Sequence, residues 1–282
     1  MIGYLSMNKV GITPGHSSDF MSEIDAQAGT MKKRINDYYL LLNRESTGNY
    51  SEIYQRSFIL LLYSYWEGFI KSAAKLYLNA IIDNTSFTQL PHCLQVMQRR
   101  TEAQLFYQNV GGHMENKTYG FYRDRRRDND VIVDRHTVLS HMYNLVDTNS
   151  NLSARTYKRI IEWLDLKLPT IELSHNLSDP CITHPEAFSN TTSIIPAPVD
   201  KGDTTKSTFS LEWQSQIDIS IDAFLYFRNG LAHDALSKAP DLDTCIFFYE
   251  FIRELLSNFK DQLIERYDAI VHQEININED SY

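Results

Sequence analysis

The sequence predicts an all-α fold, and three observations support this. The 282 residues include only 11 Gly and 8 Pro, and so few helix-breaking residues favour long helices over many short strands joined by turns. Apolar residues recur every three or four positions along several long segments, which is typical of helices with one buried face. Hydrophobic residues make up 43% of the chain, so it is expected to be globular and to bury a sizeable core.

Two long helices are expected in the first part of the chain. Residues 1–16 are expected to form a poorly ordered lead-in. A polar Ser-Ser-Asp cap then precedes a helix expected over 20–43, which has one apolar face. A break at 47–49 separates it from a helix expected over 53–82. The first half of this second helix, RSFILLLYSYWEGFIKS, is apolar nearly all round, as is typical of a central helix buried by its neighbours.

A large helical and loop insert, at about residues 85–209, is expected between the second and third core helices. Its last part, 167–209, is rich in Pro, Ser and Thr, and connections of this length are often functional. The helices expected within the insert run from Pro91 to about Asn109, near 134–147 and near 153–165.

Two further helices are expected after the insert. The first covers about 211–236, and the second runs from Pro240 to about His272, followed by an acidic tail at 273–282. The early pair and the late pair of helices are expected to form one four-helix bundle, with the insert looping out. Residues 17–272 would then form a single helical domain.

Charge and cysteine content argue against several classes of protein. A formal charge of −9 argues against a general nucleic-acid coating protein and against docking on anionic membranes, so any RNA contact must come from a local basic patch. The three widely spaced Cys include no CxxC pair and predict neither a disulfide framework nor a thiolate zinc site. A secretory signal and a long apolar run are both lacking, so a cytoplasmic location without membrane partners is expected. Familiar metal-ligand spacings and nucleotide-binding loops are also lacking, so no metal and no cofactor is expected.

The most informative polar residues lie in the stretch FLYFRNGLAHD, residues 224–234. Arg228, Asn229 and His233 lie among strongly apolar residues there, and a guanidinium in such surroundings costs free energy unless it is paired or faces a cleft. Arg228 and His233 would be separated by about 140° on an ideal helix, so they are expected to flank one groove. Gly230, between them, leaves space for a ligand or a second helix.

These side chains suit metal-independent cleavage of RNA. Histidine exchanges protons near neutral pH, arginine binds phosphate oxygens as charge builds up in the transition state, and RNA supplies its own nucleophile, the 2′-hydroxyl. One His can act as base or as acid, whereas both roles together need two groups. A symmetric dimer that unites two Arg–His pairs would supply them. The alternative is that Arg228 and His233 form an ordinary structural pair.

The sequence RNGLAHD resembles the signature of HEPN domains, which is an Arg, a neighbouring polar residue, and a His after four to six intervening positions. The segment LYSYWEGFIKSAAKLYL resembles the first long helix of the MAE-like HEPN group, where a Trp-Glu-Gly tripeptide, here residues 66–68, lies upstream of the Arg–His helix. The resemblance covers about 20–83 and 210–272, and the insert lies outside it.

The resemblance implies an α-helical bundle that usually forms a homodimer, with the motif helices facing each other across the interface. It implies a ribonuclease of a toxin–antitoxin, phage-defence or RNA-processing system, with RNA as the substrate and an antitoxin or defence-system protein as a partner. By position, Arg228 and His233 would be catalytic, and Asn229 would orient the phosphate or the His.

Trp66 and Glu67 need separate consideration because they lie in the second motif. Trp66 is expected in the hydrophobic core. Glu67 has two alternative roles: it supports the site as a hydrogen-bond partner of Arg228, or it forms a structural salt bridge.

A basic run in the insert is a candidate for the local RNA-binding patch. Aromatic residues just before it can stack on unpaired bases. The equally weighted alternative is a solvated loop whose Arg side chains pair with neighbouring Asp. The RNA-binding candidates are Tyr122, Arg123, Arg125, Arg126 and Arg127.

Two functions from different classes therefore remain. The first is an endoribonuclease with a composite Arg–His site at a dimer interface. The second is a non-catalytic helical adaptor that dimerises through the same helix and binds a partner protein or a nucleotide. Substitution of His233 by Ala separates them, because it abolishes RNA cleavage in the first case and leaves function intact in the second.

Overall fold

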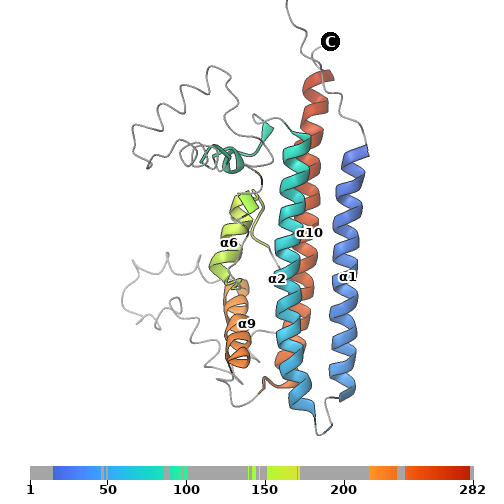
Figure 1. Cartoon of the computed structure of the whole chain (residues 1–282), viewed down its shortest axis with the longest axis vertical. Helices are drawn as coiled ribbons and strands as arrows, with labels where there is room; N and C mark the ends of the chain where they lie inside the picture. The colour runs from blue at the N-terminus through green and yellow to red at the C-terminus, as the bar shows by residue number, and fades with distance from the viewer. Residues whose placement is uncertain are drawn as a thin grey trace, which may run out of the picture.

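The structure is a computed structural model, and the elements it describes are all helices (Figure 1). No strand occurs among the described residues, so the predicted all-α fold is confirmed. The helices are α1 (Gly15–Glu45), α2 (Ser51–Asn84), α6 (Ala154–Trp163), α9 (Gln216–Ala232) and α10 (Leu242–Glu279). The described residues are 15–45, 48, 50–85, 89–96, 98–100, 139, 142–143, 146, 151–169, 171, 216–233 and 239–279.

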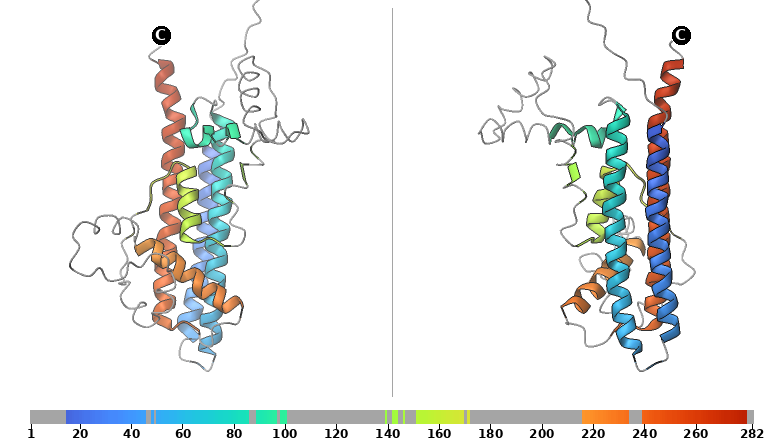
Figure 2. Two further views of the ribbon diagram at one scale, coloured as in Figure 1. Left: turned by 90° about the vertical axis from the view of Figure 1, so that its left-hand side faces the viewer. Right: turned by 45° about the vertical axis from the view of Figure 1, so that its right-hand side comes forward.

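Three long helices, α1, α2 and α10, run side by side along the length of the molecule (Figures 1 and 2). The helix α2 packs against α1, α10 and α9, as expected from its nearly continuous apolar sequence. The much shorter α9 and α6 follow one another along the remaining side of α2, so together they occupy the fourth position of the bundle (Figure 1).

Aromatic side chains join these helices in one core. The indole ring of Trp66 on α2 is fully buried and contacts the rings of Tyr157 on α6 and Phe224 on α9. On the other side of α2, Phe20 of α1 contacts the ring of Tyr267 on α10 at 4.6 Å between centroids. Burial of such large rings supplies much of the driving force that holds the bundle together.

The insert does not loop out completely, because α6 packs in the same core. Tyr157, Ile160 and Ile161 form the buried face of α6. Ser153 caps the start of the helix, and its hydroxyl accepts a hydrogen bond from the Thr156 amide at 3.2 Å. The predicted arrangement was wrong here because periodicity shows that a segment is helical but not which helix covers its apolar face.

Two helix ends differ from the prediction. The helix α9 ends at Ala232, short of the predicted 236, and α10 continues to Glu279, beyond the predicted end at His272. None of the described helices is both long and apolar enough to cross a lipid bilayer.

Candidate functional site

Arg228 projects from α9 and is held over α2. It is half-buried, and the carbon of its guanidinium lies 5.0 Å from the centroid of the Tyr63 ring, a cation–π geometry. Its Nη1 donates a hydrogen bond of 2.7 Å to Oδ1 of Asn229. The ring and the amide oxygen therefore fix the direction of the guanidinium without neutralising its charge.

The charge of Arg228 lacks a carboxylate counterion within the described part of the chain. By contrast, Arg56 pairs with Glu52 at 2.9 Å, and Arg253 pairs with Glu254 at 3.1 Å. A cation that is preoriented and not neutralised by a carboxylate can bind phosphate oxygens without first breaking an ion pair. Arg228 is therefore suited to bind an anion.

Tyr63 is the residue that supports Arg228. Only 1% of its surface is exposed, and its ring packs against Trp66 and Phe224. Its hydroxyl accepts a hydrogen bond of 2.6 Å from the amide of Leu152, just before α6. Burial raises the pKa of Tyr63 to about 12, although the Leu152 amide opposes this shift, so the phenol stays neutral at physiological pH.

His233 lies immediately after the last residue of α9 and is exposed. Its amide donates a hydrogen bond of 3.0 Å to the carbonyl oxygen of Asn229, which continues the helical hydrogen-bond pattern to this residue. Arg228 and Asn229 thus lie on the last turn of α9, and His233 follows directly with its imidazole exposed to a substrate or a second chain. Exposure suits a residue that exchanges protons with a bound molecule.

Trp66 and Glu67, the two residues of the second motif that were considered separately, are neighbours on α2. Trp66 is fully buried, which confirms that it belongs to the core. The carboxylate of Glu67 forms an ion pair of 3.0 Å with Lys71, one turn further along α2. This ion pair is a salt bridge of the kind expected for a structural role, and the supporting role of Glu67 at the site stays a prediction.

Several candidate residues lie outside the described part of the chain. They are Tyr122, Arg123, Arg125, Arg126 and Arg127, and their role in RNA binding stays a prediction. Among the described residues, no group of three or more His, Cys, Asp or Glu is placed to hold a metal ion.

Sequence reasoning missed Tyr63 as the partner of Arg228. The two residues are far apart in the chain and meet only because α9 packs on α2. The available signal was weak: Tyr63 lies one turn before Trp66 in the helix that carries the second motif. Spacing alone does not distinguish Tyr63 from the other tyrosines of this helix.

Comparison with known proteins adds one finding. The model of the family described as RiboL-PSP-HEPN matches residues 31–265, a span that includes α2, α6, α9 and most of α10. No curated protein and no solved structure matches the chain significantly. The match supports the predicted HEPN superfamily, whereas the narrower similarity to the MAE-like group stays a prediction.

Proposed function

The chain belongs to the RiboL-PSP-HEPN family, and we propose that it is a metal-independent endoribonuclease with Arg228 and His233 in its active site. The observation that carries this proposal is the guanidinium of Arg228, which is fixed by Tyr63 and Asn229 and pairs with no described carboxylate. It lies on the same helix end as an exposed imidazole.

In the proposed reaction, the 2′-oxygen of RNA forms a bond to the adjacent phosphorus while the bond to the 5′-oxygen breaks. One imidazole removes the 2′ proton, and a second donates a proton to the departing 5′-oxygen. The products are a 2′,3′-cyclic phosphate and a 5′-hydroxyl end. Arg228 binds the non-bridging oxygens, where negative charge increases in the transition state, and Asn229 holds Arg228 in place.

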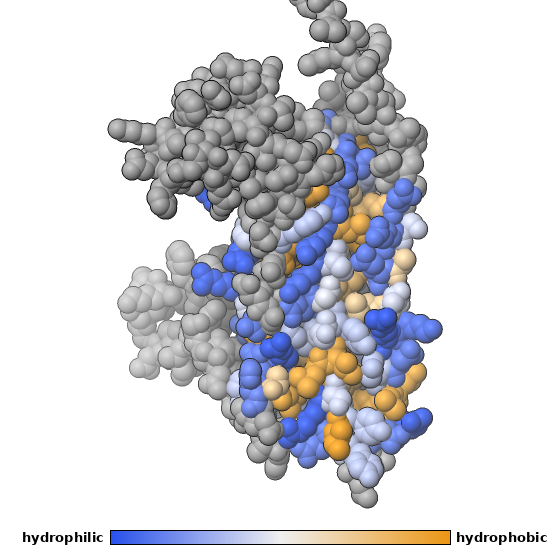
Figure 3. All heavy atoms as spheres, in the orientation of Figure 1, coloured by the Kyte–Doolittle hydropathy of each residue, from blue (hydrophilic) through white to orange (hydrophobic). Residues whose placement is uncertain are grey.

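The two imidazoles would come from His233 of two copies of the chain, related by two-fold symmetry. The structure offers a surface for such contact at the end of the bundle where α1 turns into α2 (Figure 1). We call it the apolar corner, and its most exposed residues are Leu40 (58%), Tyr50 (66%) and Ile53 (59%). Figure 3 shows hydrophobic side chains gathered over this end of the molecule.

The apolar corner has the charge pattern that contact between two identical chains requires. Tyr50 and Ile53 of this corner line a groove of about 440 Å³, and none of the residues that line the groove is charged. The ion pairs beside it, Arg44–Glu45 and Arg56–Glu52, leave no net charge. Since the whole chain carries a formal charge of −9, two copies repel least where they meet through a neutral apolar surface.

The apolar corner is linked to the segment that follows the motif helix. The amide of Ala239 donates a hydrogen bond of 3.4 Å to Glu52, which lies between Tyr50 and Ile53 in the sequence. Dimerisation there would place two motif helices at the same end of the assembly. This geometry supports a composite site formed by both chains.

We further propose a cytoplasmic toxin or phage-defence role, supported by the HEPN resemblance. The protein would cleave cellular or invading RNA, and an antitoxin or defence-system partner would restrain it. Expression of the intact chain is then expected to arrest growth. Growth would be restored by His233→Ala.

The direct test is cleavage of single-stranded RNA by the purified protein in EDTA. We expect cyclic-phosphate ends and a loss of rate of about 100-fold or more for His233→Ala, the contribution typical of a general acid or base. Because His233 is exposed, the variant should keep the helical circular dichroism of the parent protein. Full activity of His233→Ala would reject the catalytic role and favour the non-catalytic adaptor.

A further inference from the structure

One face of α6 carries a row of cationic and aromatic side chains, here called the α6 stripe: Arg155, Arg159 and Trp163. They are spaced by four residues, so they follow one another along the helix over about 12 Å. Arg155 and Arg159 are exposed, and the guanidinium carbon of Arg159 lies 4.7 Å from the centroid of the Trp163 ring. Figure 3 shows hydrophilic side chains projecting from the edge of the molecule where α6 lies.

The charges of the α6 stripe are not neutralised by described carboxylates. Neither Arg155 nor Arg159 forms a described ion pair, whereas Lys158, between them, pairs with Asp218 of α9. Glu162 is the exposed carboxylate of the same helix, and it makes no described contact with either arginine. A local cationic surface of this kind is what an acidic chain needs in order to bind a polyanion.

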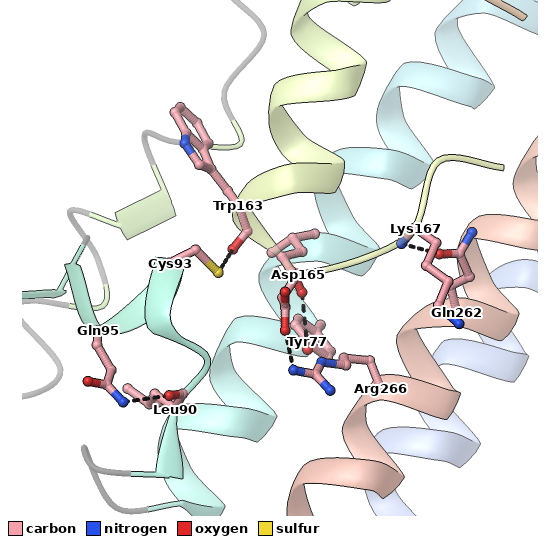
Figure 4. Close-up of polar contacts among 10 residues, drawn as sticks. Tyr77, Leu90, Cys93, Gln95, Trp163, Asp165, Lys167, Gln262 and Arg266 are labelled. Carbon is pink, nitrogen blue, oxygen red and sulfur yellow. Dashed lines mark hydrogen bonds and ion pairs between the residues drawn. The ribbon is translucent and has the colours of Figure 1, made fainter. Parts of the chain in front are cut away.

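Both ends of α6 are fixed, so the stripe is held in place. At the end of the helix, Asp165 adopts a left-handed backbone (φ 58°) and pairs with Arg266 of α10. The amide of Lys167 donates a hydrogen bond of 2.7 Å to Gln262 of α10, and Figure 4 shows the Trp163 indole pointing away from this contact network. A half-exposed aromatic ring on a helix that is held in place is a suitable platform for stacking.

The start of α6 lies beside the candidate active site. The Leu152 amide bonds to the hydroxyl of Tyr63, the residue whose ring supports Arg228. The Ala154 amide bonds to Asp222 of α9 at 2.8 Å. The α6 stripe therefore begins next to the helix that carries Arg228 and continues along the molecule away from it (Figure 1).

We propose that the α6 stripe binds the single-stranded RNA that flanks the cleaved phosphate. Arg155 and Arg159 bind backbone phosphates, and Trp163 stacks on an unpaired base. This inference rests on the proposed ribonuclease function and assigns to it a substrate-binding surface. Stacking on an indole favours single strands, because the bases of a duplex are already stacked on one another.

The first test measures binding of a fluorescently labelled single-stranded RNA to the full chain carrying His233→Ala, which prevents cleavage during the measurement. Substitution of Arg155 and Arg159 by Gln should weaken binding about tenfold or more. The slope of log affinity against log salt concentration should fall by about 1.4, since each phosphate contact on a single strand contributes about 0.7.

The matched control is the double variant Lys32→Gln, Lys33→Gln. It removes the same charge from two exposed positions on α1, on the other side of the bundle from α6 (Figure 2). It should change affinity and slope far less than the α6 variant. Equal effects of the two double variants would overturn the proposal, because they would reflect net charge rather than a local site.

A second test examines stacking. Trp163→Ala should weaken RNA binding about fivefold or more, whereas Trp163→Phe should keep most of the affinity. The half-exposed position of Trp163 allows both changes without loss of the fold, which circular dichroism checks. Equal binding by the two variants would reject a stacking role.

The outcomes distinguish this proposal from the proposed function. RNA binding that depends on the α6 stripe, in a protein that cleaves no RNA, would support the binding surface and reject the ribonuclease. If the protein cleaves RNA and the Arg155 and Arg159 variant binds RNA as well as the parent does, the ribonuclease would be supported and the binding surface rejected. The proposal would be overturned if the parent protein did not bind RNA. It would also be overturned if the α6 stripe bound an acidic protein but no RNA.

Discussion

At the scale of single residues, the candidate site depends on one aromatic ring. Tyr63 supports the guanidinium of Arg228 with its ring and the start of α6 with its hydroxyl. These two contacts use different parts of the side chain. They can therefore be separated by substitution.

Tyr63→Phe should lower the free energy of unfolding by about 1–3 kcal/mol, because it leaves the Leu152 amide without its acceptor. The ring below Arg228 remains, so the rate of RNA cleavage should change little. Urea denaturation and cleavage assays measure the two effects. Tyr226→Phe removes a hydroxyl that makes no described hydrogen bond and should leave stability nearly unchanged; a loss equal to that of Tyr63→Phe would contradict the assignment.

At the scale of elements, α6 is attached to α9 through a half-buried carboxylate. Asp222 accepts the hydrogen bond from the Ala154 amide at the start of α6. Burial raises the pKa of Asp222 above its ordinary value, with a smaller contribution from Asp218, while the Ala154 amide and Lys158 oppose the shift. The folded protein therefore holds the Asp222 proton more tightly than the unfolded chain does.

This shift gives stability a defined pH dependence. Protonated Asp222 contributes to the free energy of unfolding. This contribution is fully present below the pKa of about 3.8 in the unfolded chain, and it is lost as pH rises through the higher pKa of the folded protein. Asp222→Asn keeps an acceptor for Ala154 and cannot ionise. Relative to the parent protein, it should therefore become more stable as pH rises from 3 to 7.

Urea unfolding at several pH values measures this difference. The control is Asp83→Asn, an exposed carboxylate near the end of α2 that makes no described contact. A stability difference for Asp222→Asn that stays constant with pH, or that decreases as pH rises, would show that Asp222 is not the titrating group.

At the scale of the whole molecule, the central question is whether two copies join. The three long helices bury their apolar faces within one chain, whereas the apolar corner leaves Leu40, Tyr50 and Ile53 exposed. Exposed apolar side chains that are gathered at one end of a molecule often mark a site of contact with another protein chain.

Ile53→Asp should convert a dimer into a monomer, because it places a charge at the centre of the proposed contact. Light scattering coupled to gel filtration measures the mass directly, whether or not the protein cleaves RNA. Leu168→Asp is the matched control, since Leu168 is similarly exposed (56%) and lies outside the corner. A parent protein that is monomeric at 100-fold dilution and at high concentration alike would reject the proposed contact.

The sequence alone was enough to predict an all-α fold, its long helices and the candidate site residues. The continuous apolar run around Trp66 predicted a central helix, and α2 is that helix. The motif from Arg228 to His233 identified the helix end on which the candidate site lies. These properties are local, because helix formation and motif spacing depend on residues within a few turns of one another.

The partners that those residues meet became known only from the packing of the helices. The tertiary structure placed Tyr63 below Arg228, attached α6 to Asp222, and brought part of the insert into the core. It also showed that Glu67 pairs with Lys71 and that α9 ends before His233. Contacts between distant segments depend on how whole helix faces pack together, and many pairings satisfy the same apolar periodicity.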